Sequence, residues 1–389
     1  MTLTLDMRLQ RVAEAAFGER RGALVAIEPA TGDVLALVSK PDFDPNQFVD
    51  GIDPQYWAEL NANIDKPLNN RAISGLYPPG STIKPYLALA ALETGKRRSS
   101  NTIFDPGYFD FGGRRFRDDK KGGHGTVDMY KSIVESCDTY YYHLSNDLGI
   151  DAIARFLGPF GFGSRSGIDL AGEFTGVLPS PEWKVKRFKR PQDQKWYPGE
   201  TISIGIGQGY HSYTPLQLAQ AMAMLASGGQ MYKPRLVARI DNTRTGEQRS
   251  IDPEMIRRVA LHRENVDFIK RAMVGVIKEG TGQRAFAGAQ YSAGGKTGTA
   301  QVIAMKQNEK YEEAKVAERH RDHSLFIAFA PVDSPRIALA VIVENGGFGA
   351  RAAAPIARTV LDYFLLGKVP AGMQNPTPED EAAEEEESD

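Results

Sequence analysis

The strand-like segments of this 389-residue chain are divided between its two ends, and this division constrains the fold more than any other feature. Helical patterns fill the sequence between the two groups. The strand-like segments are residues 22–27, 34–38, 294–302, 325–330 and 337–344. The first two flank a turn-forming segment at residues 29–33 and follow a helical pattern over residues 6–17, so they predict an antiparallel hairpin. We therefore expect one sheet that both ends of the chain complete, with a final helix over residues 352–366.

The composition is that of a globular protein without a disulfide framework. Hydrophobic residues make up 41% of the chain and charged residues 25%. No apolar run is as long as a membrane span, and no signal peptide is visible. Cys137 is the sole cysteine, so an internal disulfide is excluded.

The charge of the chain is distributed unevenly. Its formal net charge is −2, but residues 379–389 carry eight acids and no base. Without those eight negative charges the rest of the chain has a net charge of +6. We expect residues 368–389 to be an acidic, disordered tail. The body is mildly basic, which suits an acidic polymer but falls short of a nucleic-acid-binding surface, so no nucleic acid partner is expected.

Ser81 lies between a helix-breaking segment and a predicted helix. Two prolines and a glycine interrupt the chain at residues 78–80, and residues 86–92 then form an apolar, helix-like run. Ser81 therefore lies at a helix N-terminus, with Lys84 one turn later on the same face. A serine hydroxyl needs a base within hydrogen-bond reach, and a lysine with a lowered pKa can be that base. Taken alone, the pair more often indicates an ordinary helix cap.

Two further motifs follow in a fixed order. Ser136 and Asp138 lie in a predicted helix over residues 129–148, where they can add a hydroxyl and a polar group to a cleft. Lys296-Thr297-Gly298-Thr299 lies on a predicted strand and offers a cation and hydroxyls at its edge. The glycine of this motif lets a substrate backbone approach closely. Each motif is weak by itself, but their order and their structural contexts make the set strong.

Two charged segments have less specific patterns. Residues 183–195 carry six basic side chains, which form either a solvated loop or a contact surface for an anionic polymer. Residues 306–322 follow the Lys296 motif, and their charge and position predict a flexible lid over the cleft.

These motifs resemble those of the penicillin-recognising serine enzymes, which include penicillin-binding proteins and serine β-lactamases. The chain is most similar to the elongation-type class B penicillin-binding proteins, the penicillin-binding protein 2 group, over residues 1–367. The segments that carry this closer resemblance are Tyr77–Ser81, Glu135–Thr139, Gly205–Tyr210, Arg321–His323 and Glu344–Gly347. The resemblance implies an α/β (α+β) transpeptidase fold, with a central antiparallel five-stranded sheet flanked by helices and an all-helical subdomain.

The resemblance implies a D,D-transpeptidase that cross-links peptidoglycan stem peptides during cell elongation and is acylated by β-lactam antibiotics. Ser81 would attack the carbonyl of the donor peptide's penultimate D-Ala, and Lys84 would take the Ser81 proton. Ser136 would relay that proton toward the leaving amine. Asp138, where the superfamily usually has asparagine and similar elongation-type proteins have aspartate, would hold Lys84 or the substrate amide.

The Lys296 motif would bind the donor in this scheme. Lys296, Thr297 and Thr299 would bind the terminal carboxylate, beside Gly298. The backbone N–H groups of Ser81 and Thr299 would form the oxyanion hole. An acceptor-strand amine would then resolve the acyl-enzyme, and no cofactor is required for this acyl transfer.

A zinc site is a further expectation. Cys137 lies between two motif residues, and Asp105, Asp118 and His124 lie upstream of it. A thiolate, an imidazole and two carboxylates can complete a tetrahedral site, although the spacing is equally that of a buried thiol with surface acids and a surface histidine. Elongation-type relatives can look like this and bind a metal, and the choice of Asp118 over Asp119 rests on that similarity. Zinc would be structural, clamping the loop and helping to place Ser136.

The resemblance also implies a setting. The membrane helix and pedestal domain usual for the subfamily are expected to be absent, so residues 1–367 would be an excised transpeptidase domain from the periplasmic face of the bacterial inner membrane. The expected partner is a glycosyltransferase of the RodA type.

Two rival functions share the motifs. A serine β-lactamase or D,D-carboxypeptidase needs an activated water, for which Glu173, Glu182 and Glu200 are candidates by residue type alone. A non-enzymatic β-lactam sensor would be acylated once and would then signal. Turnover of a chromogenic cephalosporin separates the hydrolases from the transpeptidase.

Overall fold

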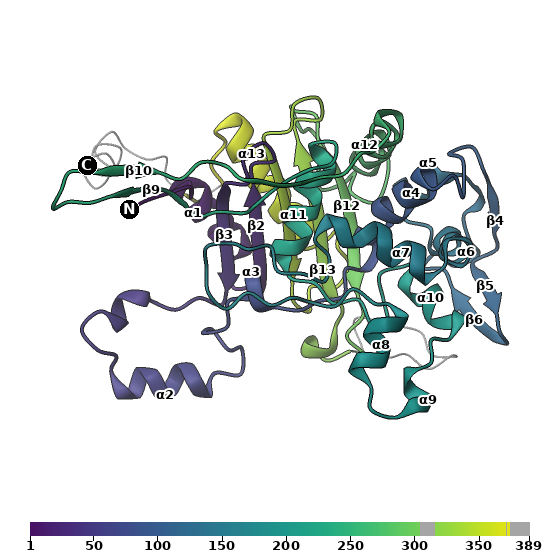
Figure 1. Cartoon of the computed structure of the whole chain (residues 1–389), viewed down its shortest axis with the longest axis horizontal. Helices are drawn as coiled ribbons and strands as arrows, with labels where there is room; N and C mark the ends of the chain where they lie inside the picture. Colours follow the sequence, from purple (N-terminus) through teal and green to yellow (C-terminus); the bar gives the residue numbers. More distant parts are fainter. Residues whose placement is uncertain (304–315, 371, 374–389) are drawn as a thin grey trace.

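The computed structural model describes residues 1–303, 316–370 and 372–373, and its centre is a five-stranded antiparallel sheet (Figure 1). The strand order is β12-β13-β14-β2-β3. The strands are β2 (Gly22–Ile27), β3 (Val34–Lys40), β12 (Gly294–Ala300), β13 (His323–Ala330) and β14 (Ile337–Val343). β14 pairs with β2, with Val341 opposite Leu24. The two ends of the chain therefore meet in one sheet, as predicted, and β12 is left at its edge.

Both faces of this sheet are covered by hydrophobic cores. All six residues of β2 are buried, with Val25 facing one core and Leu24 facing the other. Burial on both faces explains why this strand is a continuous apolar run without alternation. The covering helices are α11 (Pro215–Ala226) and α12 (Arg263–Lys278) in the first core, and α1 (Met7–Phe17) and α13 (Ala353–Leu366) in the second.

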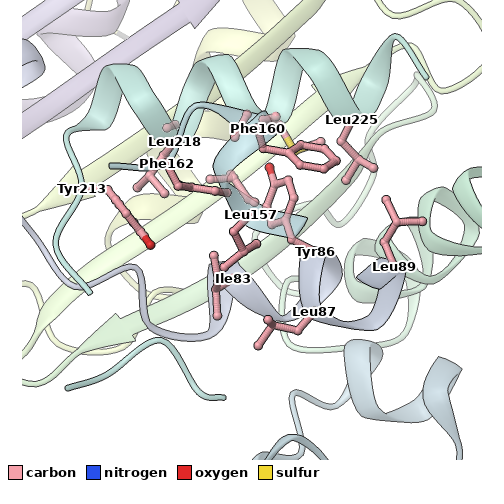
Figure 2. Packing of buried hydrophobic residues seen from close by; sticks show 14 of the residues in the cluster. Ile83, Tyr86, Leu87, Leu89, Leu157, Phe160, Phe162, Tyr213, Leu218 and Leu225 are labelled. Atoms are coloured by element: carbon pink, nitrogen blue, oxygen red, sulfur yellow. The ribbon is translucent and has the colours of Figure 1, made fainter. Parts of the chain in front are cut away.

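The helix that follows Ser81 is buried on all sides. η2 (Gly80–Ile83) leads directly into α4 (Lys84–Glu93), whose first eight residues are all buried. Figure 2 shows Tyr86 of this helix against the rings of Phe160 and Phe162, with centroid distances of 5.4 and 5.3 Å. An element enclosed this completely has little freedom to shift, so the start of α4 is a rigid platform for a reactive side chain.

A second subdomain lies beside α4 and consists mainly of helices. They are α5 (Met129–Val134), α6 (Asp138–Leu148), α7 (Ile150–Leu157), α8 (Pro181–Arg187), α9 (Pro191–Gln194) and α10 (Pro198–Ile204). It also carries two antiparallel strand pairs that the sequence did not predict. They are β4 (Ile103–Asp105) with β7 (Gly125–Val127), and β5 (Tyr108–Phe111) with β6 (Arg114–Arg117). The second pair is a hairpin that turns at Gly112 and Gly113, whose φ angles of 58° and 77° suit the tight turns that join hairpin strands.

The remaining elements are short. They are β1 (Thr2–Leu3), η1 (Pro45–Phe48), α2 (Pro54–Ala62), α3 (Arg71–Ser74), η3 (Gly158–Phe160), β8 (Gln230–Tyr232), β9 (Val237–Asp241), β10 (Gln248–Ser250), β11 (Met255–Arg258) and η5 (Glu318–His320). Much of the predicted lid, residues 304–315, and of the predicted acidic tail, residues 374–389, lies outside the described residues. Among the described residues, no helix combines the length and apolarity that crossing a membrane requires.

Candidate active site

Ser81 lies in η2, where the chain approaches the edge strand β12 before it enters α4. The Lys84 backbone N–H donates to the Ser81 carbonyl oxygen, so the two residues are one turn apart, as predicted. Gly80 has a φ of 51°, and a Cβ at this position would lie 2.4 Å from the Thr299 carbonyl oxygen. Only glycine lets the turn that carries Ser81 lie this close to β12.

The Lys84 ammonium is fully buried and has three acceptors. Its Nζ donates to the Ser136 carbonyl oxygen at 2.6 Å, to Asp138 Oδ1 at 2.6 Å and to Ser136 Oγ at 3.3 Å. Burial raises the pKa of the Asp138 carboxyl, and the neighbouring Lys84 ammonium opposes that rise. Of the two roles that the resemblance allowed for Asp138, the structure shows the contact with Lys84.

Ser136 lies at a break between two helices, and the predicted continuous helix over residues 129–148 is wrong at this point. α5 ends at Val134, α6 begins at Asp138, and Ser136 has a φ of 63°. A left-handed conformation costs about 1–2 kcal/mol for a residue with a side chain. Buried hydrogen bonds to the serine offset this cost, because Lys296 Nζ donates to Ser136 Oγ at 2.8 Å. The break thus places the Ser136 hydroxyl between two lysines.

Lys296 is the second buried lysine of the site. Burial lowers its pKa well below the ordinary range, and the Lys84 ammonium lowers it further. Its Nζ also donates to the Thr297 carbonyl oxygen at 3.1 Å. A lysine that loses its proton readily, in contact with a hydroxyl that also contacts a second lysine, is suited to proton relay.

The middle residues of the Lys296 motif have specific packing roles. Thr297 Oγ1 lies 2.6 Å from Thr281 Oγ1, a partner that follows α12 and belongs to none of the recognised motifs. A Cβ on Gly298 would lie 2.7 Å from Thr82 Cγ2 and 3.0 Å from the Pro79 carbonyl oxygen. The missing side chain therefore admits the turn that carries Ser81, while the predicted approach of a substrate backbone stays a prediction.

The backbone of Thr299 faces the open edge of β12. Its carbonyl oxygen accepts a hydrogen bond at 3.0 Å from Gln208 Nε2, which lies outside β13. Because the N–H and C=O of one strand residue point to the same side, the Thr299 N–H also points away from β13. Gln208 was not predicted as a site residue, although the glycines around it indicated close approach: a Cβ on Gly207 would lie 2.1 Å from the Gly80 carbonyl oxygen.

A buried charged cluster fixes the segment that leads into η2. Tyr77 Oη donates to Glu344 Oε1 at 2.7 Å, and Arg71 Nε donates to the same oxygen at 2.9 Å. The backbones of Tyr77 and Tyr213 exchange two hydrogen bonds, of 3.0 and 2.9 Å. Glu344 follows β14, so it ties the central sheet to the segment before Ser81.

Replacing Glu344 with alanine should lower the free energy of unfolding by about 3 kcal/mol, because it leaves the buried Arg71 guanidinium without its carboxylate partner. Urea unfolding followed by tryptophan fluorescence measures this loss. The matched control is Glu318→Ala. Glu318 pairs with Arg21, but its side chain is 53% exposed, so we expect a change below about 1 kcal/mol. Equal losses in the two variants would contradict the assignment.

The four predicted metal ligands converge beside Ser136. The ligand atoms of Asp105, Asp118, His124 and Cys137 all lie within 4.8 Å of one another, and all four residues are buried. His124 Nδ1 lies 2.8 Å from Asp105 Oδ2 and 3.3 Å from Asp118 Oδ1. Cys137 Sγ lies 3.5 Å from Asp105 Oδ2 and 3.4 Å from Asp118 Oδ2. The cluster contains Asp118 and not Asp119, as expected from the resemblance.

The donor set of this cluster fits a tetrahedral zinc ion, with one sulfur, one nitrogen and two carboxylate ligands. Burial raises the pKa of the Cys137 thiol, and the nearby Asp118 raises it further. Burial opposes ionisation of Asp118, but hydrogen bonds with the His124 and Asp119 side chains and with the backbone N–H groups of Thr139 and Lys120 together outweigh it and lower the pKa of that carboxyl. A cation bound by these ligands would displace the thiol proton.

A serine at the start of a buried helix lies next to a sheet edge and to two buried lysines that share one hydroxyl, an arrangement whose groups are suited to serine acyl transfer. The chain belongs to the family described as "Penicillin binding protein transpeptidase domain", whose family model matches residues 22–362.

The chain is similar to penicillin-binding proteins of the elongation type. It is 47% identical over 368 residues to the peptidoglycan D,D-transpeptidase MrdA of Acinetobacter baumannii, which covers 94% of this chain and 53% of the relative. The structure of Pseudomonas aeruginosa penicillin-binding protein 2 in complex with WCK 5153 superposes with a TM-score of 0.84 at 43% identity, covering 96% of this chain and 78% of that one.

A second similar structure is a complex of penicillin-binding protein 2 with MreC from Helicobacter pylori. Its TM-score is 0.81 at 31% identity, covering 94% of this chain and 64% of that one. The chain spans about half the length of the Acinetobacter baumannii relative. These similarities confirm the predicted fold class.

Proposed function

We propose that this chain is the transpeptidase domain of a D,D-transpeptidase that cross-links peptidoglycan stem peptides during cell elongation. The observation that carries the proposal is the contact of Ser136 Oγ with both Lys84 and Lys296 beside Ser81, in the fold of this family. Residues 1–367 form the catalytic domain in this proposal, and residues 368–389 are an acidic appendage to it.

Acylation starts with attack of Ser81 Oγ on the carbonyl carbon of the donor's penultimate D-Ala, while Lys84 Nζ accepts the hydroxyl proton. This role requires Lys84 to be neutral at that moment, and its contact with Ser136 Oγ at 3.3 Å gives the accepted proton a path onward. The N–H groups of Ser81 and Thr299 stabilise the oxyanion. Ser136 passes the proton to the leaving amine, and free D-Ala departs as the Ser81 ester forms.

The second half-reaction transfers the acyl group to an amine of the acceptor strand. The amine attacks the ester carbon, the Ser81–carbonyl bond breaks, and the amine's proton returns to Ser81 through the same relay. Lys296, Thr297 and Thr299 bind the donor's terminal carboxylate in the first half-reaction, beside Gly298. Thr281 holds the Thr297 hydroxyl in position for this contact.

The structure disfavours the hydrolytic rivals, because two of their three candidate glutamates are engaged elsewhere. The Glu173 carboxylate accepts the Ser166 backbone N–H at 2.6 Å, and Glu200 pairs with the buried Lys184. Glu182 lies exposed on α8.

Intact mass after incubation with benzylpenicillin tests the proposal. We expect an adduct that persists for many minutes with little loss of penicillin. Rapid loss of penicillin without an adduct would support a β-lactamase. A second assay supplies a stem pentapeptide and an added amine acceptor. A transpeptidase releases D-Ala and joins the remaining peptide to the acceptor, whereas a sensor forms the penicillin adduct and releases no D-Ala.

The partners follow from the same proposal. The solved complex of a similar penicillin-binding protein 2 with MreC supports assembly of proteins of this kind with other cell-elongation components. For this chain we infer stem peptides and β-lactam antibiotics as ligands, and a RodA-type glycosyltransferase as partner. Those ligands and that partner locate the domain at the periplasmic face of the inner membrane.

We also propose that Asp105, Asp118, His124 and Cys137 hold a structural zinc ion. Bound zinc would cross-link the ligands without taking part in acyl transfer. Cys137 supplies the cap of α6, because its Sγ accepts the Tyr140 backbone N–H at 3.4 Å. Fixing this sulfur fixes the helix break that places Ser136.

Protein purified without chelator should contain about one zinc ion per chain, and Cys137→Ala should contain less than about a tenth of that amount, because four-ligand sites bind weakly after the loss of the thiolate. Elemental analysis measures the content. Asp119→Ala, which changes an acid next to the cluster but outside it, is the control and should keep its metal. Metal-free wild-type protein, or equal metal in Cys137→Ala, would refute the site.

A further inference from the structure

Residues 180–210 fold around one buried lysine. Lys184 Nζ donates to Glu200 Oε2 at 2.7 Å and to the Lys195 carbonyl oxygen at 2.7 Å. Its ammonium lies 5.3–5.7 Å from the centroids of three aromatic rings, those of Trp196, Tyr197 and Tyr210. This arrangement of cation, carboxylate and rings gives α8 and α9 a fixed position on the helical subdomain.

The outer surface of this segment carries the other cations. We call Lys186, Arg187, Lys189 and Lys195 the basic face, and all four are exposed. Arg190 pairs with Asp193 at 2.6 Å, whereas none of the basic face forms an ion pair within the described part of the chain. Tyr197 adds a ring that is 48% exposed and lies 5.5 Å below the Lys195 ammonium. The surface therefore combines four exposed cations, none in an ion pair with the residues that the structure describes, with an accessible aromatic ring.

The basic face is linked to the candidate active site through packed residues. Tyr210 packs against Trp183 of α8 with a centroid distance of 5.1 Å and follows two residues after Gln208. Gln208 Nε2 in turn binds the Thr299 carbonyl oxygen. α10, which follows the basic face, packs on α6, the helix that begins at Asp138. Figure 1 shows α8 and α9 projecting from the subdomain below α7 and α10.

We propose that the basic face binds a peptidoglycan glycan strand, with the cations contacting the carboxylates of its peptides and the Tyr197 ring stacking on a sugar. The inference rests on the proposed function and extends it to a second contact with the same polymer. The strand is anionic and rich in sugar rings, which matches the charge and the exposed ring. A strand held here keeps its peptides close to Ser81, which raises their effective concentration at the cleft.

The strand and its peptides are polyvalent, so binding is measured with the intact polymer. The full chain is mixed with purified insoluble peptidoglycan at low salt and sedimented. The triple variant Lys186→Glu, Arg187→Glu and Lys189→Glu should bind about tenfold more weakly than wild type, because it reverses three of the four cations. Added salt should weaken wild-type binding in the same direction.

A matched control reverses three exposed arginines outside this segment. This control variant combines Arg244→Glu, Arg249→Glu and Arg258→Glu, and it changes the net charge by the same amount. The three arginines lie on or beside β10 and β11. We expect binding within about twofold of wild type, since only local charge contacts the strand. Thermal unfolding shows whether each variant is folded. Equal losses in both triple variants, or wild-type binding by the Lys186 triple variant, would overturn the proposal.

Two further measurements identify the ligand. Tyr197→Ala should weaken sedimentation severalfold and Tyr197→Phe should restore it, since stacking needs the ring and not the hydroxyl. Vesicles of phosphatidylglycerol test the other anionic surface, a lipid bilayer. If the Lys186 triple variant loses vesicle binding and keeps peptidoglycan binding, the face is a lipid surface and the proposal is wrong. Acylation of wild type by a fluorescent penicillin reports the proposed function separately, so its failure would not be confused with failure of strand binding.

Discussion

Replacing Ser81 with alanine should abolish covalent labelling by benzylpenicillin. The variant lacks the Oγ that forms the ester but keeps the backbone N–H groups of Ser81 and Thr299 and the contacts of Lys84. We expect the acylation rate to fall by at least about 10⁴-fold, as for other catalytic nucleophiles. Intact mass recorded over time measures the rate. Because a single half-buried hydroxyl is lost, the free energy of unfolding should change by less than about 1 kcal/mol.

The control for this variant is Ser227→Ala. Ser227 is also half-buried, and its hydroxyl donates to the Gln230 carbonyl oxygen at 2.7 Å after the end of α11. It should be acylated at the wild-type rate. An adduct on Ser81→Ala that forms as fast as on wild type would place the nucleophile elsewhere and would remove the basis of the proposed mechanism.

Replacing Lys84 with methionine should lower the acylation rate by about 10³-fold, because the proposed general base is lost while the length of the side chain is nearly kept. Stopped-flow acylation with a chromogenic cephalosporin measures the second-order rate constant. The change also leaves the Asp138 carboxylate and the Ser136 carbonyl without their donor, so we expect a loss of stability of about 3 kcal/mol.

A second substitution separates the chemical effect from the structural one. Adding Asp138→Asn to Lys84→Met removes the unpaired charge, so part of the stability should return while acylation stays slow. Lys270→Met serves as the general control, since this partly buried lysine lies over the Phe329 ring and outside the proposed mechanism. Recovery of acylation together with stability in the double variant would show that Lys84 supports the fold and is not the base.

The central sheet was predictable from the sequence because its strands are enclosed on both faces. β2 and β14 consist almost wholly of apolar residues, and such runs at the two ends of a chain have few ways to be buried other than beside each other. α4 was predictable in part, because residues 86–92 form an apolar, helix-like run, whereas the burial of its first eight residues is a finding of the structure. The two strand pairs at residues 103–127 were missed because their strands are only three or four residues long, although Pro106-Gly107, Gly112-Gly113 and Gly122-Gly123 all indicate turns.

The lysines and serines of the site were predictable from motif order, but the way they meet was not. Nothing in residues 135–138 indicates a break: there is no glycine or proline, and Ser136 takes its left-handed conformation where two distant lysines bind it. Thr281 and Gln208 were missed for a related reason. Each acts through one contact with β12, from a position 16 and 91 residues away in sequence.

The pairing of β14 with β2 also affects how this chain folds during its synthesis. The partner of the inner edge of the β2–β3 hairpin is synthesised about three hundred residues after the hairpin itself. Contacts between such distant segments form slowly, because closing the long intervening loop costs conformational entropy before the strand pairing stabilises the product. Until β14 is available, β2 presents an apolar, unpaired edge that other nascent chains can join. A translation product that stops before β13 would therefore be expected to aggregate, because it lacks the strand that pairs with β2.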